Sequence, residues 1–155
     1  MPVIRQNNFV AATAADLESL GERFAGQTTP FRLIFVRGPL GAGKTTWVRG
    51  LLRGLGYRGP VKSPTFTLVE PYQLAQREFF HFDLYRVQDP EELEFMGMRD
   101  YIQGNNLCVV EWPERGAQIL PAPDVDVIIQ PGDTGRSVQL AAHCENNESP
   151  FGGSG

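Results

Sequence analysis

Apolar residues recur along the chain with two periods, one typical of helices with a single apolar face and one typical of buried strands. Helical spacing follows Thr13 and Asp16, which resemble a capping box with Asp in place of the usual Glu, and predicts a first helix over about 14–25. A continuous apolar run then predicts a strand over 31–36. Helical spacing returns from 44 to about 55, where glycines end it.

The middle of the chain predicts two neighbouring strands followed by a helix. Residues 67–72 and 78–86 are strand-like and are separated by a short break, which is the spacing of a hairpin. Asp89 as N-cap and Pro90 in the first turn, followed by acidic residues, then predict a helix that stops near Gly97. Such a hairpin would place antiparallel strands beside a parallel core.

Three further strands are expected in the last third of the chain. The short apolar run at 107–110 is typical of a strand buried on both faces. Segments 125–130 and 137–142 are strand-like, with a turn at 131–133 between them. Residues 145–155 are polar and rich in glycine, so a disordered tail is expected there.

The most informative motif joins the first predicted strand to the second predicted helix. It is Gly38-Pro39-Leu40-Gly41-Ala42-Gly43-Lys44-Thr45, which has the spacing of a P-loop. Its glycines permit backbone conformations that allow consecutive N–H groups to point at phosphate oxygens, and the helix N-terminus adds further donors. Lys44 can reach the outer phosphates, and the Thr45 hydroxyl can bind a metal ion. The motif predicts a site for a nucleoside triphosphate with magnesium.

A glycine-rich turn that precedes a lysine by chance would look the same. At ordinary residue frequencies, however, its four fixed positions match by chance in well under about 1% of chains of this length. The flanking strand and helix lower that fraction further. The sequence therefore predicts an α/β fold, a P-loop NTPase-like three-layer sandwich with a mixed, mainly parallel central sheet. The length of 155 residues suits a single P-loop ATPase domain over 1–144.

Charge, cysteine content and the lack of long apolar segments exclude some functions and cellular locations. The formal net charge of -4 argues against a stand-alone nucleic-acid-binding protein, whose contact surface would be basic. A local basic cluster either meets a partner or RNA or is an ordinary solvated helix face; it consists of Arg49, Arg53, Arg58 and Lys62. The two cysteines lack metal-binding spacing and suit a reducing compartment. With no signal-peptide pattern and no membrane-length apolar segment, we expect a cytoplasmic protein without membrane contact.

Hydrolysis of a bound triphosphate also needs carboxylates that hold the metal ion or position water. Asp83 and Glu111 stand at the ends of two apolar runs, where ligands of α/β sheets gather. One of the two would bind magnesium with Thr45, and the other would orient or activate the attacking water. Alternatively, both are solvated acids at strand ends, which is common for carboxylates.

Three residues near these acids have more than one interpretation. His81, which stands between two phenylalanines, is expected to be a hydrogen-bonded structural residue rather than a catalytic base. Thr65 follows Ser63-Pro64 and lies either in a plain turn or in a switch whose hydroxyl senses the outermost phosphate. Trp112 either fills core or fixes the geometry of Glu111.

Taken together, these motifs resemble one family closely, the bacterial TsaE proteins, also called YjeE, the P-loop ATPases of tRNA threonylcarbamoyladenosine synthesis. The matching segments keep the family's order and spacing: 38–46, 62–69, 81–86, 89–97 and 110–114. The resemblance implies ATP and Mg²⁺, with weak hydrolysis that matters mainly in complex with TsaB and TsaD. In that family TsaD transfers the threonylcarbamoyl group to the adenosine beside the anticodon, and tRNA is expected to be contacted only through the complex.

The resemblance also implies roles for single residues. Lys44 would hold phosphate, Thr45 and Glu111 would bind Mg²⁺, Asp83 would be the catalytic or water-ordering acid, and Thr65 would be a switch residue. The candidate catalytic residues are thus Asp83, Glu111, Lys44 and Thr65, and the candidate metal ligands are Thr45, Glu111 and Asp83. The candidate nucleotide-binding residues are Thr13, Gly38, Gly41, Ala42, Gly43, Lys44, Thr45, Thr46, Trp112 and Arg136.

Two other functions compete with this interpretation. A small-molecule kinase also uses a P-loop and magnesium, but it needs an acceptor pocket and a closing, arginine-bearing lid, and the sequence has no lid-like insertion. A non-catalytic binding module controlled by nucleotide is the second alternative. Asp83 and Glu111 argue against it, although very slow hydrolysis would resemble it.

Overall fold

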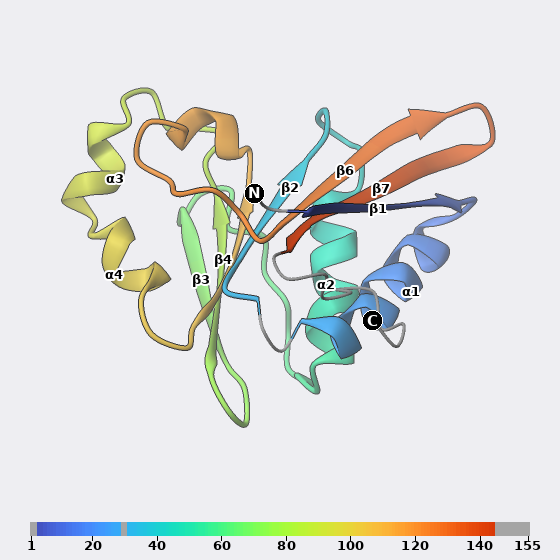
Figure 1. Ribbon diagram of the computed structural model, residues 1–155, viewed down its shortest axis with the longest axis horizontal. Coiled ribbons are helices and arrows are strands. Elements are labelled where there is room, and N and C mark those ends of the chain that lie inside the picture. The colour runs from blue at the N-terminus through green and yellow to red at the C-terminus, as the bar shows by residue number, and fades with distance from the viewer. Residues whose placement is uncertain (1–2, 29–30, 145–155) are drawn as a thin grey trace.

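The computed structural model has a seven-stranded sheet between two layers of helices (Figure 1). It describes residues 3–28 and 31–144. The strands are β1 Val3–Ala11, β2 Leu33–Arg37, β3 Val69–Gln73, β4 Glu78–Asp83, β5 Leu107–Glu111, β6 Val125–Gly132 and β7 Gly135–Cys144. The helices are α1 Ala14–Phe24, α2 Lys44–Gly54, α3 Glu91–Phe95 and α4 Met98–Ile102, with 3-10 turns at Ala25–Gln27 (η1) and Pro113–Gly116 (η2). The tail predicted at 145–155 lies outside the described residues.

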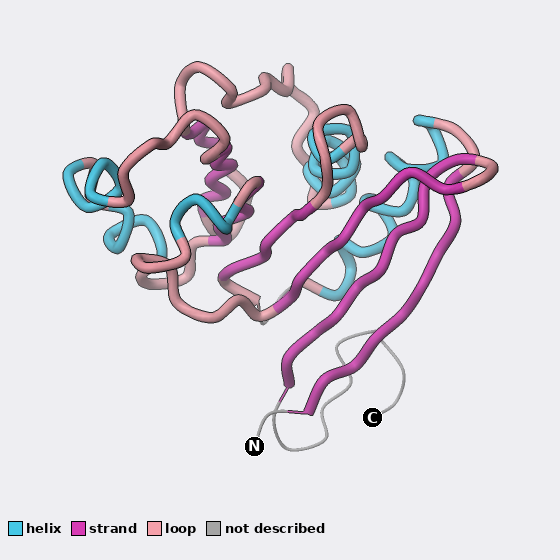
Figure 2. Tube along the Cα trace, turned by 90° about the horizontal axis from the view of Figure 1, so that it is seen from above, coloured by secondary structure: helices cyan, strands magenta, loops and turns pink. Residues whose placement is uncertain are grey.

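The sheet is parallel in its centre and antiparallel at both edges. Its strand order is β1-β7-β6-β2-β5-β4-β3. The neighbours β6, β2, β5 and β4 pair in parallel, whereas β1 with β7, β7 with β6, and β4 with β3 pair antiparallel. Figure 2 shows β1, β7 and β6 running side by side. The expected α/β fold with a mixed sheet is confirmed, including the β3–β4 hairpin.

Two apolar clusters hold the layers together, one on each face of the sheet. Successive β2 residues alternate between them: Ile34 and Val36 pack with α1 and α2, whereas Leu33 and Phe35 pack with the layer that contains α3 and α4. Because both faces are covered, the central strand β5 is buried at every position. The prediction of a doubly buried strand at 107–110 is therefore confirmed.

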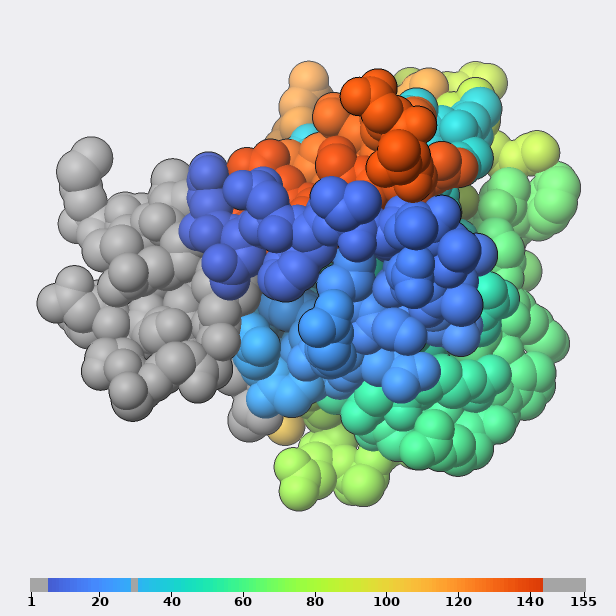
Figure 3. Space-filling model, turned by 90° about the vertical axis from the view of Figure 1, so that its right-hand side faces the viewer, coloured from blue at the N-terminus to red at the C-terminus, as the bar shows by residue number. Residues whose placement is uncertain are grey.

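Helices α1 and α2 approach each other closely through glycines. A Cβ at Gly50 would lie 1.9 Å from the Glu18 carbonyl oxygen, and a Cβ at Gly21 would lie 2.2 Å from the Trp47 carbonyl oxygen. At the start of α1, Thr13 and Asp16 form the expected capping box. Figure 3 shows β1 and α1 in blue beside the β6–β7 hairpin in orange and red. This close packing fixes α2, whose N-terminus follows the P-loop.

The structure differs from the sequence-based prediction in several local elements. Strand β1 and helix α4 were not predicted. β4 ends at Asp83 rather than extending to residue 86, and β3 begins only at residue 69 because Leu68 has a positive φ of 73°. Helix α3 takes Pro90 as its N-cap, while the Asp89 carboxylate accepts a hydrogen bond from the Glu91 N–H at 3.0 Å. In the described part of the chain, no helix is long and apolar enough to cross a membrane.

Candidate nucleotide site

The P-loop is a tight turn between β2 and α2, held in shape by three glycines. Gly38, Gly41 and Gly43 have φ values of 154°, 76° and 100°, which residues with side chains rarely adopt. A Cβ at Gly38 would lie 2.3 Å from the Ile129 carbonyl oxygen, and one at Gly43 would lie 2.4 Å from Leu17 Cδ2. The loop therefore depends on glycine for conformation and for space, as an anion cradle of backbone N–H groups requires.

Lys44 begins α2 and bends back over the P-loop. Its Nζ donates hydrogen bonds to the carbonyl oxygens of Gly38 at 2.7 Å and Pro39 at 2.9 Å. The same ammonium lies 4.6 Å from the centroid of the Trp112 ring, a cation–π distance. Lys44 is only 5% exposed. A buried cation held by carbonyl oxygens at the N-terminus of a helix is positioned to pair with phosphate.

Burial shifts the pKa of two charged groups beside the P-loop. It lowers the pKa of Lys44 below its ordinary value, an effect opposed by the negative charges of Glu111, Asp83 and Glu114. It raises the pKa of Asp83, and the hydrogen bond from the Tyr85 N–H opposes that shift. A bound polyphosphate would favour the charged form of the lysine.

Glu111 lies at the centre of a short chain of hydrogen bonds. Thr45 Oγ1 donates to Glu111 Oε2 at 2.9 Å, and His81 Nε2 shares a hydrogen bond with the same oxygen at 2.6 Å. His81 is fully buried and Glu111 is 3% exposed. A carboxylate and a hydroxyl next to a phosphate cradle are the hard oxygen ligands that Mg²⁺ prefers. The residues present thus fit a magnesium site that bound phosphates and water would complete.

Asp83 occupies the matching position on the neighbouring strand but has different partners. It pairs with Glu111 in the β4–β5 register. Thr65 Oγ1 donates to Asp83 Oδ2 at 3.3 Å, and the Tyr85 N–H donates to Asp83 Oδ1 at 3.0 Å. Ser63 Oγ lies 2.7 Å from Thr65 Oγ1. The two acids are therefore adjacent, and Glu111 contacts the end of the P-loop whereas Asp83 contacts the loop that contains Thr65.

A cavity of about 300 Å³ adjoins the P-loop on the side of α1. Six of the predicted nucleotide-binding residues line it: Thr13, Gly41, Ala42, Gly43, Thr46 and Arg136. The Arg136 guanidinium donates from Nε to the Ala42 carbonyl oxygen at 2.9 Å and from Nη2 to that of Gly41 at 3.0 Å. The β6–β7 hairpin is thereby tied directly to the P-loop. The size and position of this cavity suit the base and ribose of a nucleotide.

Trp112 has an unusual backbone conformation beside the site. Its φ of 57° lies in the left-handed region, which costs free energy for a residue with a side chain. Its ring centroid lies 4.8 Å from that of Tyr85, and the Lys44 ammonium lies 4.6 Å from the same Trp112 centroid. Because Trp112 directly follows Glu111, this conformation lets one short segment present both a carboxylate and an aromatic ring to the P-loop.

Two features of the site qualify the sequence-based picture. Arg49 forms an ion pair with Glu18 at 2.6 Å, and Arg53 donates to the carbonyl oxygens of Tyr57 and Gly59, so much of the basic cluster serves the local structure. The contact of His81 with Glu111 was not predicted. The sequence did contain a hint of this contact. His81 and Asp83 are two residues apart on one strand, so the His81 side chain lies on the same face of the sheet as the predicted site acid.

No cluster of three or more His, Cys, Asp or Glu side chains suited to a metal ion occurs within residues 3–28 and 31–144. Within these residues, Mg²⁺ at Thr45 and Glu111 would need further oxygen ligands. This is the usual arrangement where substrate phosphates and water supply the remaining oxygens.

Comparison with known proteins gives one consistent family. The family model for "Threonylcarbamoyl adenosine biosynthesis protein TsaE" matches residues 11–138. The tRNA threonylcarbamoyladenosine biosynthesis protein TsaE of Haemophilus influenzae is 53% identical over 110 residues, covering 71% of this chain and 70% of that protein. The TsaE of Bacillus subtilis is 31% identical over 140 residues, covering 90% and 87%. The crystal structure of B. subtilis YdiB is similar with a TM-score of 0.75 and 26% identity, covering 90% of this chain and 87% of that one.

Proposed function

The chain belongs to the TsaE family, and we propose that it binds and hydrolyses Mg-ATP in support of tRNA threonylcarbamoyladenosine biosynthesis. Membership supports the role in this tRNA modification. The observation that most supports ATP hydrolysis is the hydrogen bond from Thr45 to Glu111, directly beside the buried Lys44. A hydroxyl and a carboxylate, the oxygen ligands that Mg²⁺ prefers, thus lie side by side next to the P-loop, which supports the proposal.

Binding would begin with the P-loop backbone. Its N–H groups and the N-terminus of α2 would receive the phosphates. The Lys44 ammonium would exchange the carbonyl oxygens of Gly38 and Pro39 for phosphate oxygens. Thr45 and Glu111 would hold Mg²⁺, which neutralises charge on the phosphates when bound. The base and ribose would occupy the cavity lined by Thr13, Thr46 and Arg136.

Hydrolysis would depend on the second acid. Asp83 would accept a hydrogen bond from the attacking water and orient it toward the outermost phosphate. The Thr65 hydroxyl, which now donates to Asp83, would turn toward the phosphate and link the loop around it to the nucleotide state. Lys44 and the backbone donors would stabilise the charge on the outer phosphate during cleavage.

The output of the cycle would be a conformational change passed to protein partners. We expect those partners to be TsaB and TsaD, in the cytoplasm, with tRNA contacted only through the complex. A P-loop domain of this size has little room for a second substrate lobe, and its net charge of -4 does not suit direct binding of nucleic acid. ATP hydrolysis would then set the timing of the modification cycle.

Reconstituted tRNA modification tests this proposal. A mixture of TsaB, TsaD, tRNA, ATP and an activated threonylcarbamoyl donor is supplied with the chain or its Asp83→Asn variant, and modified adenosine is counted over many turnovers. We expect sustained modification with the natural chain and little with the variant. Glu78→Gln, at the opposite, exposed end of β4, is the matched control and should behave as the natural chain. Equal modification with an Asp83→Asn variant that no longer hydrolyses ATP would exclude a role for hydrolysis.

A further inference from the structure

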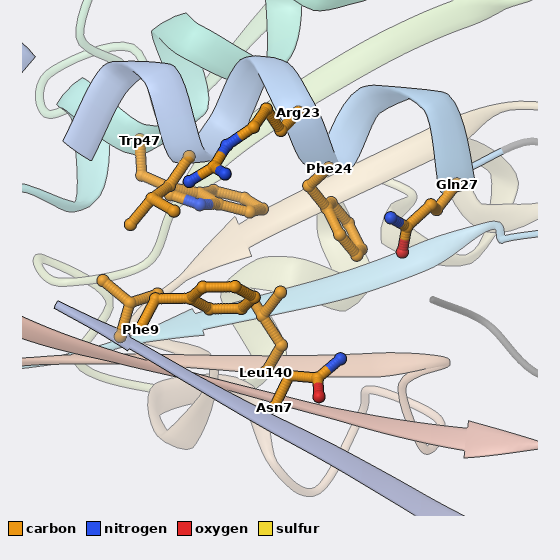
Figure 4. Close-up of a pocket in the computed structure, with 9 residues that line it drawn as sticks. Asn7, Phe9, Arg23, Phe24, Gln27, Trp47 and Leu140 are labelled. Atoms are coloured by element: carbon orange, nitrogen blue, oxygen red, sulfur yellow. The ribbon is translucent and has the colours of Figure 1, made fainter. Parts of the chain in front are cut away.

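A second cavity lies between α1 and the strands β1 and β7, and no P-loop residue lines it. Its volume is about 190 Å³. Aromatic rings form much of its wall: Phe9 from β1, Phe24 from α1 and Trp47 from α2. Figure 4 shows Trp47 and Phe24 on the helix side, with Phe9 and Leu140 on the strand side. A space with aromatic walls on both sides suits a flat ring.

Two buried polar atoms on side chains that line this cavity have no hydrogen-bond partner in the described part of the chain. They are the Trp47 Nε1 donor and the Gln27 Oε1 acceptor. Trp47 is fully buried. Figure 4 shows the two side chains at opposite ends of the cavity, with Phe24 between them. Unpaired buried polar groups cost free energy, so a ligand that satisfied both would gain affinity.

A positive charge lies at the Trp47 end. Arg23 lines the cavity and is exposed, and Figure 4 shows its guanidinium on the same side as the indole. Among the described residues, no carboxylate lies within ion-pair distance of Arg23. An anionic acceptor at this end would receive a hydrogen bond from Trp47 and pair with the guanidinium.

We propose that this cavity is a binding site for a small planar aromatic carboxylate with an amino or N–H donor at the far end of its ring. The carboxylate would contact Trp47 and Arg23, the ring would lie between the aromatic walls, and the donor would reach Gln27. Each group of the ligand answers a feature of the cavity: the unpaired indole N–H, the apolar rings and the unpaired amide oxygen.

The site would also be coupled to the nucleotide site, because four elements line both cavities. On α1, Leu17 faces the nucleotide cavity and Leu20 the second one; on α2, Thr46 and Trp47 do so in turn. On β1, Ala11 lines the nucleotide cavity and Phe9 the second one, and on β7 Arg136 and Val138 do so in turn. A ligand wedged between α1 and β7 would fix both elements and strengthen nucleotide binding. This coupling rests on the proposed ATP site, whereas binding in the second cavity does not.

Binding of 4-aminobenzoate tests the site without any nucleotide. The two indole N–H signals of the full chain are followed by NMR during titration, with Trp47→Phe used to assign them. We expect the Trp47 signal to shift saturably and the Trp112 signal to stay in place. Benzoate, which lacks the donor, and aniline, which lacks the carboxylate, should both bind more weakly.

Arg23→Gln is the diagnostic variant, because an exposed side chain can be changed without loss of fold. It should weaken 4-aminobenzoate about tenfold, the loss expected for one charge-assisted hydrogen bond. Arg58→Gln, a second exposed arginine outside the cavity, should bind as the natural chain does. An unshifted Trp47 signal at millimolar probe, or equal affinity in Arg23→Gln, would overturn the site. If the probe binds but ADP affinity does not rise by about fivefold, the coupling is overturned alone.

Discussion

At the scale of single residues, the proposed function makes Lys44 the side chain that would contribute most to nucleotide affinity. It is the buried cation of the P-loop, and its two carbonyl partners leave it ready to exchange them for phosphate. Lys44→Ala should reduce ATP affinity by about a hundredfold or more, since several charge-assisted hydrogen bonds are lost together. Isothermal titration calorimetry measures this, with Lys62→Ala as the control. Near-normal affinity in Lys44→Ala would contradict the P-loop assignment.

Glu111 and Asp83 should separate binding from hydrolysis. Glu111 contacts Thr45, so Glu111→Ala should weaken the dependence of ATP binding on magnesium. Asp83 contacts Thr65 instead, so Asp83→Ala should leave ATP binding near normal and reduce hydrolysis by about a hundredfold or more. Binding is measured with and without Mg²⁺, and phosphate release is measured at saturating ATP. If the two variants behave alike, the roles are not separate.

Cys108 should be unreactive in the folded chain. It is fully buried on β5, its thiol donates to the Tyr101 carbonyl oxygen at 3.2 Å, and burial raises its pKa to about 12. The ordinary pKa of a cysteine thiol is 9.0, so at pH 8 the thiolate fraction of Cys108 in the native protein would be about a thousandfold lower than that of an exposed cysteine. Alkylation by iodoacetamide, read by mass spectrometry of the Cys108 peptide, should be slow in buffer and fast in urea. Equal rates would show that β5 is not protected.

At the scale of elements, the α1–α2 contact should be sensitive to single methyl groups. Gly50→Ala would place a Cβ 1.9 Å from the Glu18 carbonyl oxygen and should lower the free energy of unfolding by about 1–3 kcal/mol. Gly26→Ala is the matched control, because a Cβ there meets nothing within 4 Å. It should change stability by less than about 0.5 kcal/mol. Urea unfolding of both variants decides whether this contact is as close as described.

The elements that the sequence predicts best are those with a strong local pattern. The capping box at Thr13, the glycines of the P-loop and the apolar run of β5 each specify their own structure. β1 was missed because residues 5–8 are polar, and its strand conformation comes from pairing with β7, more than a hundred residues away. α4 was missed because the positive φ of Gly97 ends one short helix and begins another.

The sequence motifs nominate the residues of the candidate site, but they do not show which of these residues contact one another. Motif spacing places Asp83 and Glu111 at strand ends, yet only the sheet register brings them side by side. The same applies to Arg136, whose hydrogen bonds to the P-loop cross from the other end of the sequence. The hydrogen bond between His81 and Glu111 likewise depends on the pairing of β4 with β5.

At the scale of the whole molecule, the size and net charge of the chain suit the proposed ATPase to act through partners. The cavity proposed for the nucleotide is bounded by α1, the P-loop and the β6–β7 hairpin, so a bound nucleotide would alter how these elements pack. The loop around Thr65 carries an exposed Phe66, which is 79% accessible, beside the residues that would sense phosphate. A change in that loop would therefore reach the surface.

Magnesium-dependent phosphate release from ATP tests the central claim most directly. It is measured for the purified chain alone and after addition of TsaB, TsaD and tRNA, with Lys44→Ala as the inactive reference. We predict slow release by the chain alone and a clear rise with the partners. Release that ignores the partners, or transfer of the phosphate to a small molecule instead of water, would contradict the claim and favour a kinase.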